Sequence, residues 1–256
     1  MIPEIQVAFD NGVLAVTISR PGKKNAITND MYGALADAIA RANTESEIRV
    51  LLIQADGDSF TAGNDVSEFA AEAAGNGPKE RQVARFLQGL ANATVPIVAA
   101  VQGKAVGIGT TMLLHCDYVL LSEDAQLMTP FVNLALVPEA ASSYLLPLRI
   151  GHSRAFEMFA LGEAVSAHAA VAWGIANKAT PAADLHAEAR RIAGKIATRP
   201  NGSLTATKRM MRDAERLIAQ MNDERATLLE RLVSAEAKEA FAAFAQKRKP
   251  DFTKAV

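Results

Sequence analysis

The sequence is short of the features that mark several large classes of protein. One cysteine, Cys116, among 256 residues excludes a disulfide framework within the chain and suits a reducing compartment. Lys and Arg number 27 against 28 Asp and Glu, and this balance disfavours a general polyanion binder, which needs a basic face. A hydrophobic content of 50% excludes a disordered chain. These absences leave a globular protein, either one large domain or a core with a small appendage.

Signals for export or membrane insertion are also missing. The N-terminal segment carries acids at Glu4 and Asp10 and has no basic region followed by an apolar block, so it does not read as a signal peptide. No apolar run approaches the ~20 residues that span a bilayer. We therefore expect a soluble, cytoplasmic protein with no membrane and no nucleic-acid partner.

Familiar motifs of ligand binding and catalysis are incomplete or absent. Gly107-Ile108-Gly109 begins like a dinucleotide fingerprint, but Met112 stands where the third glycine belongs. Gly103-Lys104 lacks the rest of a phosphate loop, and no G-x-S-x-G motif occurs. The four histidines show no ligand spacing, and Cys116 lies in an apolar stretch typical of a buried small side chain. Catalysis by His, Cys or a bound metal therefore has little support, and we expect no metal site.

The hydrophobic pattern predicts an α/β protein. Ile5–Phe9 and Val13–Ile18 are typical of strands around a turn at residues 10–12, and Thr28 is suited to cap a helix with apolar residues at helical spacing. Strands then alternate with helices, which favours crossover connections. Further strands are expected at 50–54, 96–101 and 117–121, and further helices at 66–74, 80–90, 110–115, 203–221, 223–232 and 234–246.

The composition changes towards the C-terminus. Beyond about residue 198 the pattern is almost purely helical and rich in Ala, the best helix former. We place a boundary near residue 200, with a core at 1–199 and a helical region at 200–256. Residues 71–78 are interpreted as a flexible surface segment.

Two segments are suited to display main-chain N–H groups. Phe60–Asp65 has small residues that let a ligand approach the backbone, and Gly103–Gly109 is a strand end that feeds a helix. The start of a helix has unpaired N–H groups and a partial positive charge, and two such groups on one oxygen form an oxyanion hole. The alternative is that both segments are ordinary Gly-containing turns.

One acid is unusual. Glu139 follows an apolar run and Pro138, and it leads into a segment with helical character. A structural role would be a first-turn acid favoured by the helix dipole. A functional role would be a general base whose pKa is raised by an apolar pocket.

Together these segments resemble a known family. Residues 19–26 (SRPGKKNA), 60–65 (FTAGND), 105–109 (AVGIG), 116–118 (CDY) and 247–252 (KRKPDF) are similar in order and spacing to the enoyl-CoA hydratase/isomerase, or crotonase, superfamily. The resemblance covers nearly the whole chain. It implies a spiral core of β-β-α units and a C-terminal helical region, 200–256, that forms a homo-trimer or hexamer.

The resemblance also implies a ligand and its contacts. The ligand would be an acyl-CoA thioester, with coenzyme A entering as part of the substrate and no separate cofactor. The N–H groups of Asn64 and Ile108 would bind the thioester carbonyl oxygen, and Lys23, Lys24 and Lys249 are candidate phosphate partners, unless they are simply solvated. The remaining candidate substrate-binding residues are Ala26, Ala62, Gly63, Asp65, Val66, Gly107, Thr111 and Phe131.

The chain departs from the hydratase pattern at the two positions that would carry acids. Thr111 stands two residues after Gly109, and Phe131 stands eight residues before Glu139. A single Glu at position 139 is similar to the branch that converts 3-enoyl-CoA to 2-enoyl-CoA. One carboxylate would remove a C2 proton and return it at C4, while the oxyanion hole holds the dienolate.

Several alternatives remain open from the sequence. The enzyme readings are a hydratase or another crotonase-type reaction such as epoxy-acyl-CoA isomerisation, and the non-enzymatic reading is a CoA-binding protein. Phe131 is a wall that excludes water, a core residue, or both. Thr111 either positions the substrate or bonds back to its own helix. Asp65 either caps a helix or braces the segment Phe60–Asp65, the first donor loop.

Overall fold

The computed structural model describes residues 2–65, 67–68, 77–78 and 80–254. The expectations for Val66, for most of the helix at 66–74 and for most of the flexible segment at 71–78 lie outside these residues. The predicted hairpin is confirmed, with an antiparallel register that pairs Asp10 with Val13. The main sheet has the order β1-β2-β3-β4-β6-β9 and is otherwise parallel. Its strands are β1 (Ile5–Asp10), β2 (Val13–Ile18), β3 (Val50–Ala55), β4 (Ile97–Val101), β6 (Tyr118–Ser122) and β9 (Lys178–Thr180).

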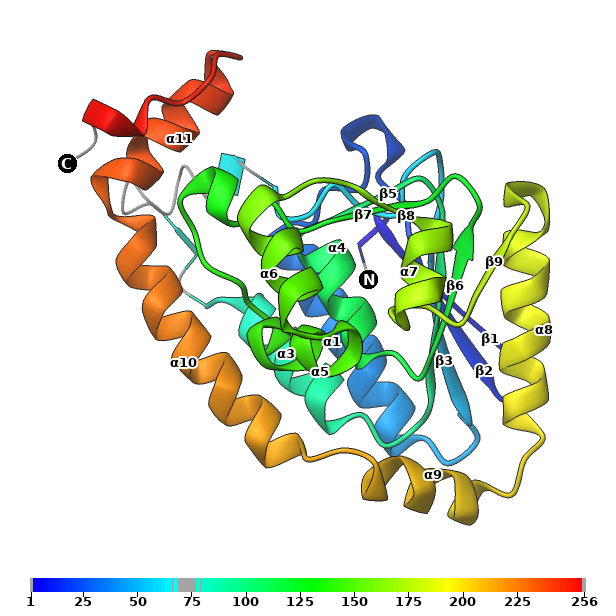
Figure 1. The fold of residues 1–256 in the computed structure, drawn as a ribbon. Coiled ribbons are helices and arrows are strands. Elements are labelled where there is room, and N and C mark those ends of the chain that lie inside the picture. Colours follow the sequence, from blue (N-terminus) through cyan, green and yellow to red (C-terminus); the bar gives the residue numbers. More distant parts are fainter. Residues whose placement is uncertain (1, 66, 69–76, 79, 255–256) are drawn as a thin grey trace.

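Both faces of this sheet are covered, as parallel sheets require. On β3, Leu51 and Ile53 point into the larger core, while Val50 and Leu52 pack against the helix α8 (Leu185–Ala197). Figure 1 shows α8 on one side of the sheet and α1 and α3 on the other. The alternation of two buried faces explains why β3 reads as a continuous apolar run.

Two helices form the first layer of the larger core. They are α1 (Asn29–Thr44) and α3 (Gln82–Asn92). The predicted cap of α1 is confirmed, since the Thr28 hydroxyl accepts a hydrogen bond from the N–H of Met31. The apolar face of α1 packs on the sheet in this core, and Tyr32 of α1 contacts Asn64 in the predicted site.

A second, three-stranded sheet was not predicted. Its order is β5-β7-β8, from β5 (Lys104–Val106), β7 (Gln126–Met128) and β8 (Val165–Ser166). We expected residues 102–109 to be only a turn. Strands of two or three residues have no readable alternation, so their pairing is set by tertiary contacts.

The helix expected at 110–115 begins earlier and changes type. The structure has α4 (Ile108–Thr111), opened by Gly107 with a φ of 57°, followed by a 3-10 turn at Met112–His115. The remaining helices before the predicted boundary are α5 (Ser142–Ile150), α6 (His152–Leu161) and α7 (Ala167–Trp173), and short 3-10 turns lie at Pro21–Lys23, Val132–Leu134 and Ala182–Asp184.

The C-terminal helices differ from the prediction in their breaks. The single helix expected at 203–221 is wrong: the chain forms α9 (Asn201–Met210) and then α10 (Ala214–Leu232), which also includes the helix expected at 223–232. The break occurs because the Asp213 side chain accepts the N–H of Arg216 and caps a new helix. The last helix, α11 (Ala235–Ala245), starts at a Ser234 cap close to the prediction, and a 3-10 turn at Phe252–Lys254 follows it.

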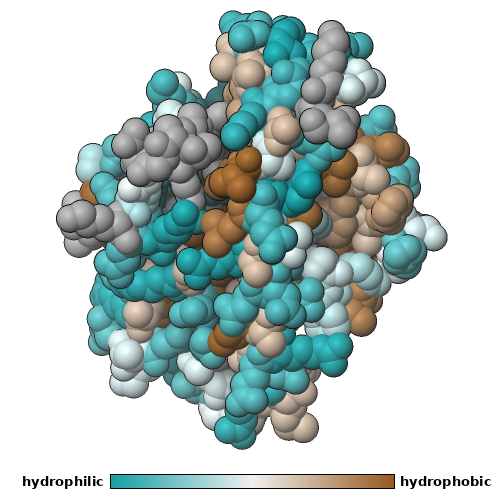
Figure 2. Space-filling view, turned by 90° about the vertical axis from the view of Figure 1, so that its left-hand side faces the viewer, coloured by the Kyte–Doolittle hydropathy of each residue, from teal (hydrophilic) through white to brown (hydrophobic). Residues whose placement is uncertain are grey.

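The surface over the C-terminal helices is mixed. Figure 2 shows apolar patches among hydrophilic ones on this side of the molecule. Val233 and Phe244 are exposed hydrophobic residues of the C-terminal region. The expected assembly through residues 200–256 stays a prediction. Across the residues that the structure describes, none of the helices combines the length and apolarity needed to cross a membrane.

Candidate active site

The first predicted donor loop, residues 60–65, is held by backbone hydrogen bonds on both sides. Thr61 forms an isolated parallel bridge with Ala105, and Asn64 forms one with Ile27. The N–H of Ile27 donates to the Gly63 carbonyl at 2.8 Å, and the N–H of Asp65 donates to the Ile27 carbonyl at 3.0 Å. The loop is therefore fixed to the main chain before any side chain contributes.

The second donor loop, residues 103–109, lies directly against the first. A Cβ atom on Gly63, whose φ is 91°, would lie 2.9 Å from the Val106 carbonyl oxygen, and one on Gly109 would lie 2.5 Å from Thr61 Cγ2. The N–H of Gly107 is used by the small sheet, because it donates to Met128 at 2.9 Å. Only residues without a side chain permit this approach of the two loops.

The two predicted N–H donors are available to a ligand. Ile108 is the first residue of α4, a position whose N–H has no partner within the helix. In the part of the chain that the structure describes, no carbonyl or side chain accepts a hydrogen bond from the N–H of Asn64 or Ile108. Two free N–H groups on touching loops are the arrangement that an oxyanion hole requires.

Glu139 lies in the loop between Val132–Leu134 and α5, before the first turn of that helix. The hydroxyl of Thr111 donates to Glu139 Oε1 at 2.7 Å, which joins the carboxylate to α4. Burial raises the pKa of Glu139 to about 7, the Thr111 hydrogen bond opposes this rise, and the charge of Glu224 adds to it. A carboxylate with a pKa near neutrality is suited to take up and return a proton.

Tyr32 was missed by the sequence analysis. Its hydroxyl donates a short hydrogen bond to Asn64 Oδ1, and its ring packs beside Phe86 with centroids 5.4 Å apart. Burial raises the pKa of Tyr32, and the charges of Glu139 and Glu68 add to the rise. Tyr32 therefore connects α1 to the first donor loop and lies within electrostatic reach of Glu139. Its helical spacing with core residues gave no sign of this role.

The loop at residues 19–26 is joined to the first donor loop by side chains. Arg20 forms an ion pair with Asp65 at 2.6 Å and donates to the Ala26 carbonyl at 2.9 Å. Buried Asn25 donates to the carbonyls of Asp56 and Ser59 at 2.7 and 2.8 Å. Asp65 thus braces the first donor loop against residues 19–26. It also accepts the N–H of Ser67, as a helix cap would.

The predicted phosphate partners lie on the surface. Lys23 and Lys24 are exposed around the 3-10 turn at Pro21–Lys23, where the Lys24 carbonyl accepts the N–H of Ala62. Lys249 is exposed beyond the end of α11. No hydrogen bond or ion pair between described residues joins Lys249 to the loop at 19–26, so its proposed role rests on the resemblance alone.

The two residues that replace the hydratase acids have distinct surroundings. Thr111 bonds to Glu139, so the alternative of bonding back to its own helix is wrong. Phe131 packs in a cluster with Leu136 and Leu232, and its ring contacts Phe159 with centroids 6.3 Å apart. Core packing is therefore confirmed for Phe131, whose Cε1 also lies 3.9 Å from the Cβ position of Gly107.

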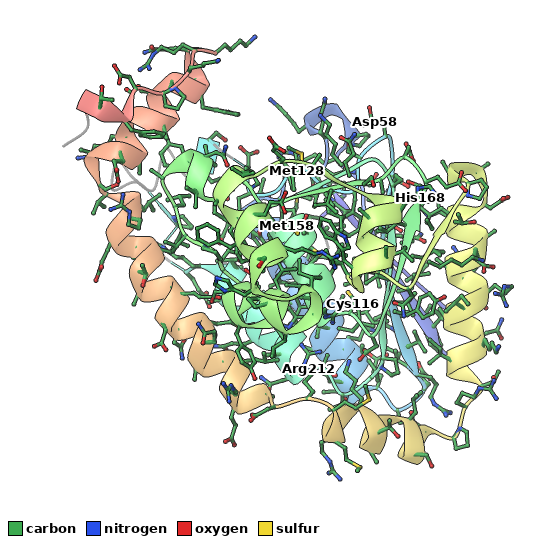
Figure 3. All side chains as sticks on the ribbon, viewed as in Figure 1. Asp58, Cys116, Met128, Met158, His168 and Arg212 are labelled. Carbon is green, nitrogen blue, oxygen red and sulfur yellow. The ribbon has the colours of Figure 1, made fainter. Side chains whose placement is uncertain are left out.

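Cys116 and His115 are unsuited to acid–base or nucleophilic chemistry because both are buried. Cys116 lies inside the molecule (Figure 3), and burial raises the pKa of its thiol to about 12. Burial, followed by the charge of Arg212, lowers the pKa of His115 to about 3. Neither group is ionised near neutral pH. The described residues contain no group of three or more His, Cys, Asp or Glu side chains able to hold a metal ion.

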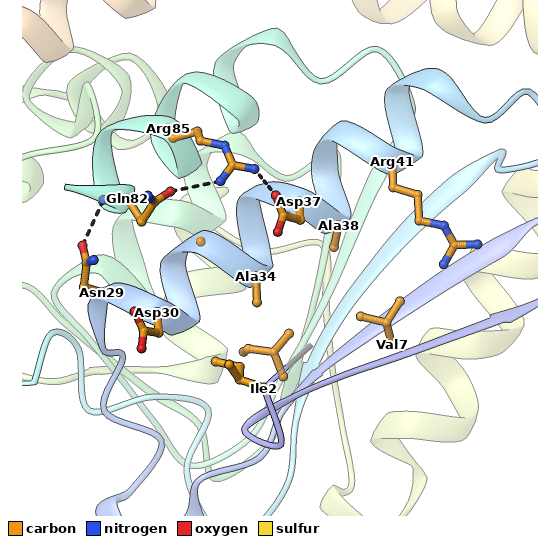
Figure 4. Close-up of a pocket in the computed structure, with 12 residues that line it drawn as sticks. Ile2, Val7, Asn29, Asp30, Ala34, Asp37, Ala38, Arg41, Gln82 and Arg85 are labelled. Atoms are coloured by element: carbon orange, nitrogen blue, oxygen red, sulfur yellow. Dashed lines mark hydrogen bonds and ion pairs between the residues drawn. The ribbon is translucent and has the colours of Figure 1, made fainter. Parts of the chain in front are cut away.

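A surface pocket of about 490 Å³ lies elsewhere, between α1, β1 and the start of α3. Figure 4 shows its polar rim, where Arg85 meets Asp37 and Gln82. None of the described site residues predicted from the sequence lines it. The candidate site is instead the junction of the two donor loops with Thr111 and Glu139.

Comparisons with known proteins give this arrangement a family. A family model described as enoyl-CoA hydratase/isomerase matches residues 8–255. The chain is 31% identical over 253 residues to 1,2-epoxyphenylacetyl-CoA isomerase of Escherichia coli (strain K12), covering 95% of this chain and 96% of that protein. It is 33% identical to enoyl-CoA delta isomerase 2 of Rattus norvegicus, covering 96% of this chain and 64% of the relative.

A solved structure agrees with these relatives. The crystal structure of an enoyl-CoA hydratase/isomerase from Pseudoalteromonas atlantica T6c superposes with a TM-score of 0.93 at 41% identity, covering 97% of this chain and 99% of that one. The fold and the site define an α/β protein in which two loops with free main-chain N–H groups adjoin the helix that bonds to Glu139. The chain belongs to the enoyl-CoA hydratase/isomerase family of enzymes, within the crotonase superfamily, as the resemblance predicted.

Proposed function

We propose that this enzyme isomerises a 3-enoyl-CoA to a 2-enoyl-CoA, with Glu139 as the acid/base. The observation that carries the proposal is the buried carboxylate of Glu139 beside α4 and the donor loops, with a pKa raised to about 7 by burial. Such a group is largely ionised above neutrality, so it accepts a proton, and it releases the proton readily afterwards.

The reaction follows from these groups. The carboxylate of Glu139 breaks the C2–H bond, and the electrons move through the thioester to form a dienolate. The N–H groups of Asn64 and Ile108 bind the dienolate oxygen. Glu139 then delivers the same proton to C4, so the double bond lies between C2 and C3 and no atom is gained or lost.

Hydration is disfavoured by the same surroundings. A hydratase-type reaction needs a second acid, and the two positions that would supply it hold Thr111 and the packed Phe131. The hydroxyl of Thr111 is already engaged with Glu139. A second candidate, isomerisation of an epoxy-acyl-CoA, is favoured by the E. coli relative, which matches along 96% of its length.

We propose that the CoA portion enters along the loop at 19–26. Lys23 and Lys24 are exposed there beside the first donor loop, with Ala26, Ala62 and Gly63 forming the adjoining backbone. Substitution of both lysines by Ala is expected to raise KM for the acyl-CoA and leave kcat near the parental value.

The deciding experiment replaces Glu139 with Gln. We expect the kcat for a 3-enoyl-CoA, followed by absorbance of the conjugated thioester, to fall by about 10²–10⁴-fold, the usual contribution of a general base. Glu123→Gln, an exposed acid at the end of β6, is the control and keeps parental activity. Full activity in Glu139→Gln would remove the proposal. Parental turnover of an epoxy-acyl-CoA, without turnover of a 3-enoyl-CoA, would replace it with the second candidate.

A further inference from the structure

The backbone that follows Glu139 has a costly conformation. Ala140 has a φ of 63° and Ala141 a φ of 55°, so two consecutive residues with side chains are in the left-handed region. This conformation brings Cβ close to the carbonyl oxygen and is rare outside glycine. It persists only where the surroundings hold it.

One carboxylate from the C-terminal region supplies most of that support. Glu224 of α10, only 7% exposed, accepts the N–H of Ala141 at 2.6 Å and the N–H of Ser143 at 2.9 Å, and it also accepts the hydroxyl of Ser143. On the other side, His115 Nε2 lies 2.7 Å from the Ala140 carbonyl oxygen and donates to it. The bend after Glu139 is thus held at its N–H groups by Glu224 of α10 and at the Ala140 carbonyl by His115.

Glu224 also serves as the N-terminal cap that the sequence around α5 does not supply. The N-cap residue of α5 is Ala141, which has no side chain able to accept a hydrogen bond. The first N–H groups of a helix need acceptors, and an anion there is favoured by the helix dipole. A carboxylate 83 residues away in sequence therefore does what a local Ser or Asp usually does.

The packing of α10 fixes this carboxylate in place. Leu217, Met221 and Glu224 follow one another at spacings of four and three residues on one face of the helix. Leu217 and Met221 are buried against Ala91 and Ala141. Figure 1 shows α10 along the flank of the molecule beside α3 and α5. The side chain of Gln220 adds a hydrogen bond to the Ser143 hydroxyl at 3.0 Å.

Building on the proposed function, we propose that Glu224 is a positioning residue for the reaction, which holds Glu139 against Thr111 through the Ala140–Ser143 backbone. The C-terminal helix α10 is then part of the catalytic apparatus. Glu224 does not touch the substrate in this scheme. It acts through the bend that it fixes and through its charge.

The charge has a defined sign. Among the residues that the structure describes, the ionisable groups within electrostatic reach of Glu139 are Glu224 on α10 and Tyr32 on α1, while Thr111 on α4 contributes a neutral hydrogen bond. Negative Glu224 raises the pKa of Glu139. Removing this charge therefore lowers the pKa of Glu139. Loosening the bend alone does not dictate whether that pKa rises or falls.

The test compares Glu224→Gln with Glu230→Gln. Both remove one negative charge from α10, but Glu230 is exposed. The Glu224→Gln substitution keeps one accepting oxygen and loses the other. We expect kcat to fall by about tenfold or more with KM little changed, and the acidic limb of the kcat profile to move to lower pH. Glu230→Gln keeps the parental values.

A charge-retaining variant separates the effect of the bend from the effect of the charge. It also replaces Glu224→Gln if circular dichroism shows that Glu224→Gln is unfolded. Glu224→Asp keeps the charge but is one methylene shorter, so its carboxylate withdraws from the bend. We expect a lowered kcat with the acidic limb at its parental pH. Parental kcat and parental pH profile in a folded Glu224→Gln or Glu224→Asp, with only a lower stability, would overturn the proposal and leave Glu224 a structural cap.

A direct titration keeps this test apart from the proposed function. The Glu139 carboxyl is titrated by carbon NMR of glutamate-labelled protein, and its signal is assigned by its loss in Glu139→Gln. A lower midpoint in Glu224→Gln than in Glu230→Gln supports the proposal even if the parent turns over no 3-enoyl-CoA. If both the midpoint and the chemical shift of the Glu139 carboxyl carbon are unchanged, the result counts against the positioning role of Glu224, whichever reaction the enzyme performs.

Discussion

The two sides of the candidate site are held by different kinds of contact. The amide side, residues 60–65 and 103–109, is fixed first by main-chain hydrogen bonds and by glycines that let its two loops touch, and the side chains of Arg20 and Tyr32 add to them. The carboxylate side, residues 131–143, is fixed by side chains that come from α4, the 3-10 turn at Met112–His115 and α10. The main-chain groups thus have little freedom, while Glu139 depends on three separate partners. We expect substitutions to break the first side abruptly and to tune the second by degrees.

The largest effect is expected on the amide side from Gly63→Ala. The added Cβ meets the Val106 carbonyl oxygen at 2.9 Å, and Gly63 has a left-handed φ, so the loops must separate. We expect a loss of about 1–3 kcal/mol in the free energy of unfolding, measured with denaturant. Loss of one aligned donor should also lower kcat by roughly 10²–10³-fold.

Gly194→Ala is the matched control for this variant. Gly194 lies in α8, and a Cβ there meets nothing within 4 Å. Ala is the better helix former, so stability should rise by about 0.5–1 kcal/mol with unchanged kcat. Parental activity in Gly63→Ala would show that the amide side tolerates separation and would remove the contrast between the two sides.

A graded effect is expected on the carboxylate side from Thr111→Val. Its hydrogen bond lowers the pKa of Glu139, so its loss raises that pKa further above about 7. Since the base must be ionised, activity falls below neutral pH and recovers at high pH. A hydrogen bond worth about 1 kcal/mol predicts a drop of roughly fivefold at pH 6, read from the pH profile of kcat.

Thr111→Ser keeps the hydroxyl and should keep the parental profile. An acidic limb that stays at the same pH in Thr111→Val would mean that the Thr111 hydrogen bond does not govern the ionisation of Glu139. A uniform fall at every pH would instead indicate that Thr111 acts on geometry alone.

The smallest effect is expected from Tyr32→Phe. Tyr32 bonds to the amide side and is within electrostatic reach of Glu139 on the carboxylate side. The ring keeps its contact with Phe86, and only the hydrogen bond to Asn64 Oδ1 is lost. Because the loop retains its backbone bridges, we expect kcat to fall by roughly two- to fivefold. Tyr118→Phe on β6 is the control and should match the parent. A fall beyond a hundredfold would assign Tyr32 a direct part in proton transfer.

The same division explains what could be predicted from the sequence. The hairpin at residues 5–18, the cap at Thr28 and the two donor loops depend on turn residues, small residues and local spacing, which a sequence displays. Glu139 was recognisable as an acid after an apolar run. Its Thr111 partner was named only because the resemblance placed a hydratase acid there.

The missed contacts join residues that lie far apart in the chain. Glu224 and Ala141 are 83 residues apart, Arg20 and Asp65 are 45 apart, and Tyr32 and Asn64 are 32 apart. Each of these side chains lies in a segment whose local pattern fully explains it as part of a helix or a surface loop. The break between α9 and α10 was missed for another reason, since the Asp213 cap competes with a continuous helical pattern.

The reach of Glu224 has a consequence for biosynthesis. A ribosome adds Ala141 well before Glu224, and the 83 residues between them take roughly 4–17 s at ~5–20 residues per second. During that interval the nascent strands and amide loops can assemble, but the bend after Glu139 has no carboxylate to accept its N–H groups. Glu139, the proposed acid/base, therefore reaches its final setting only after α10 has been made.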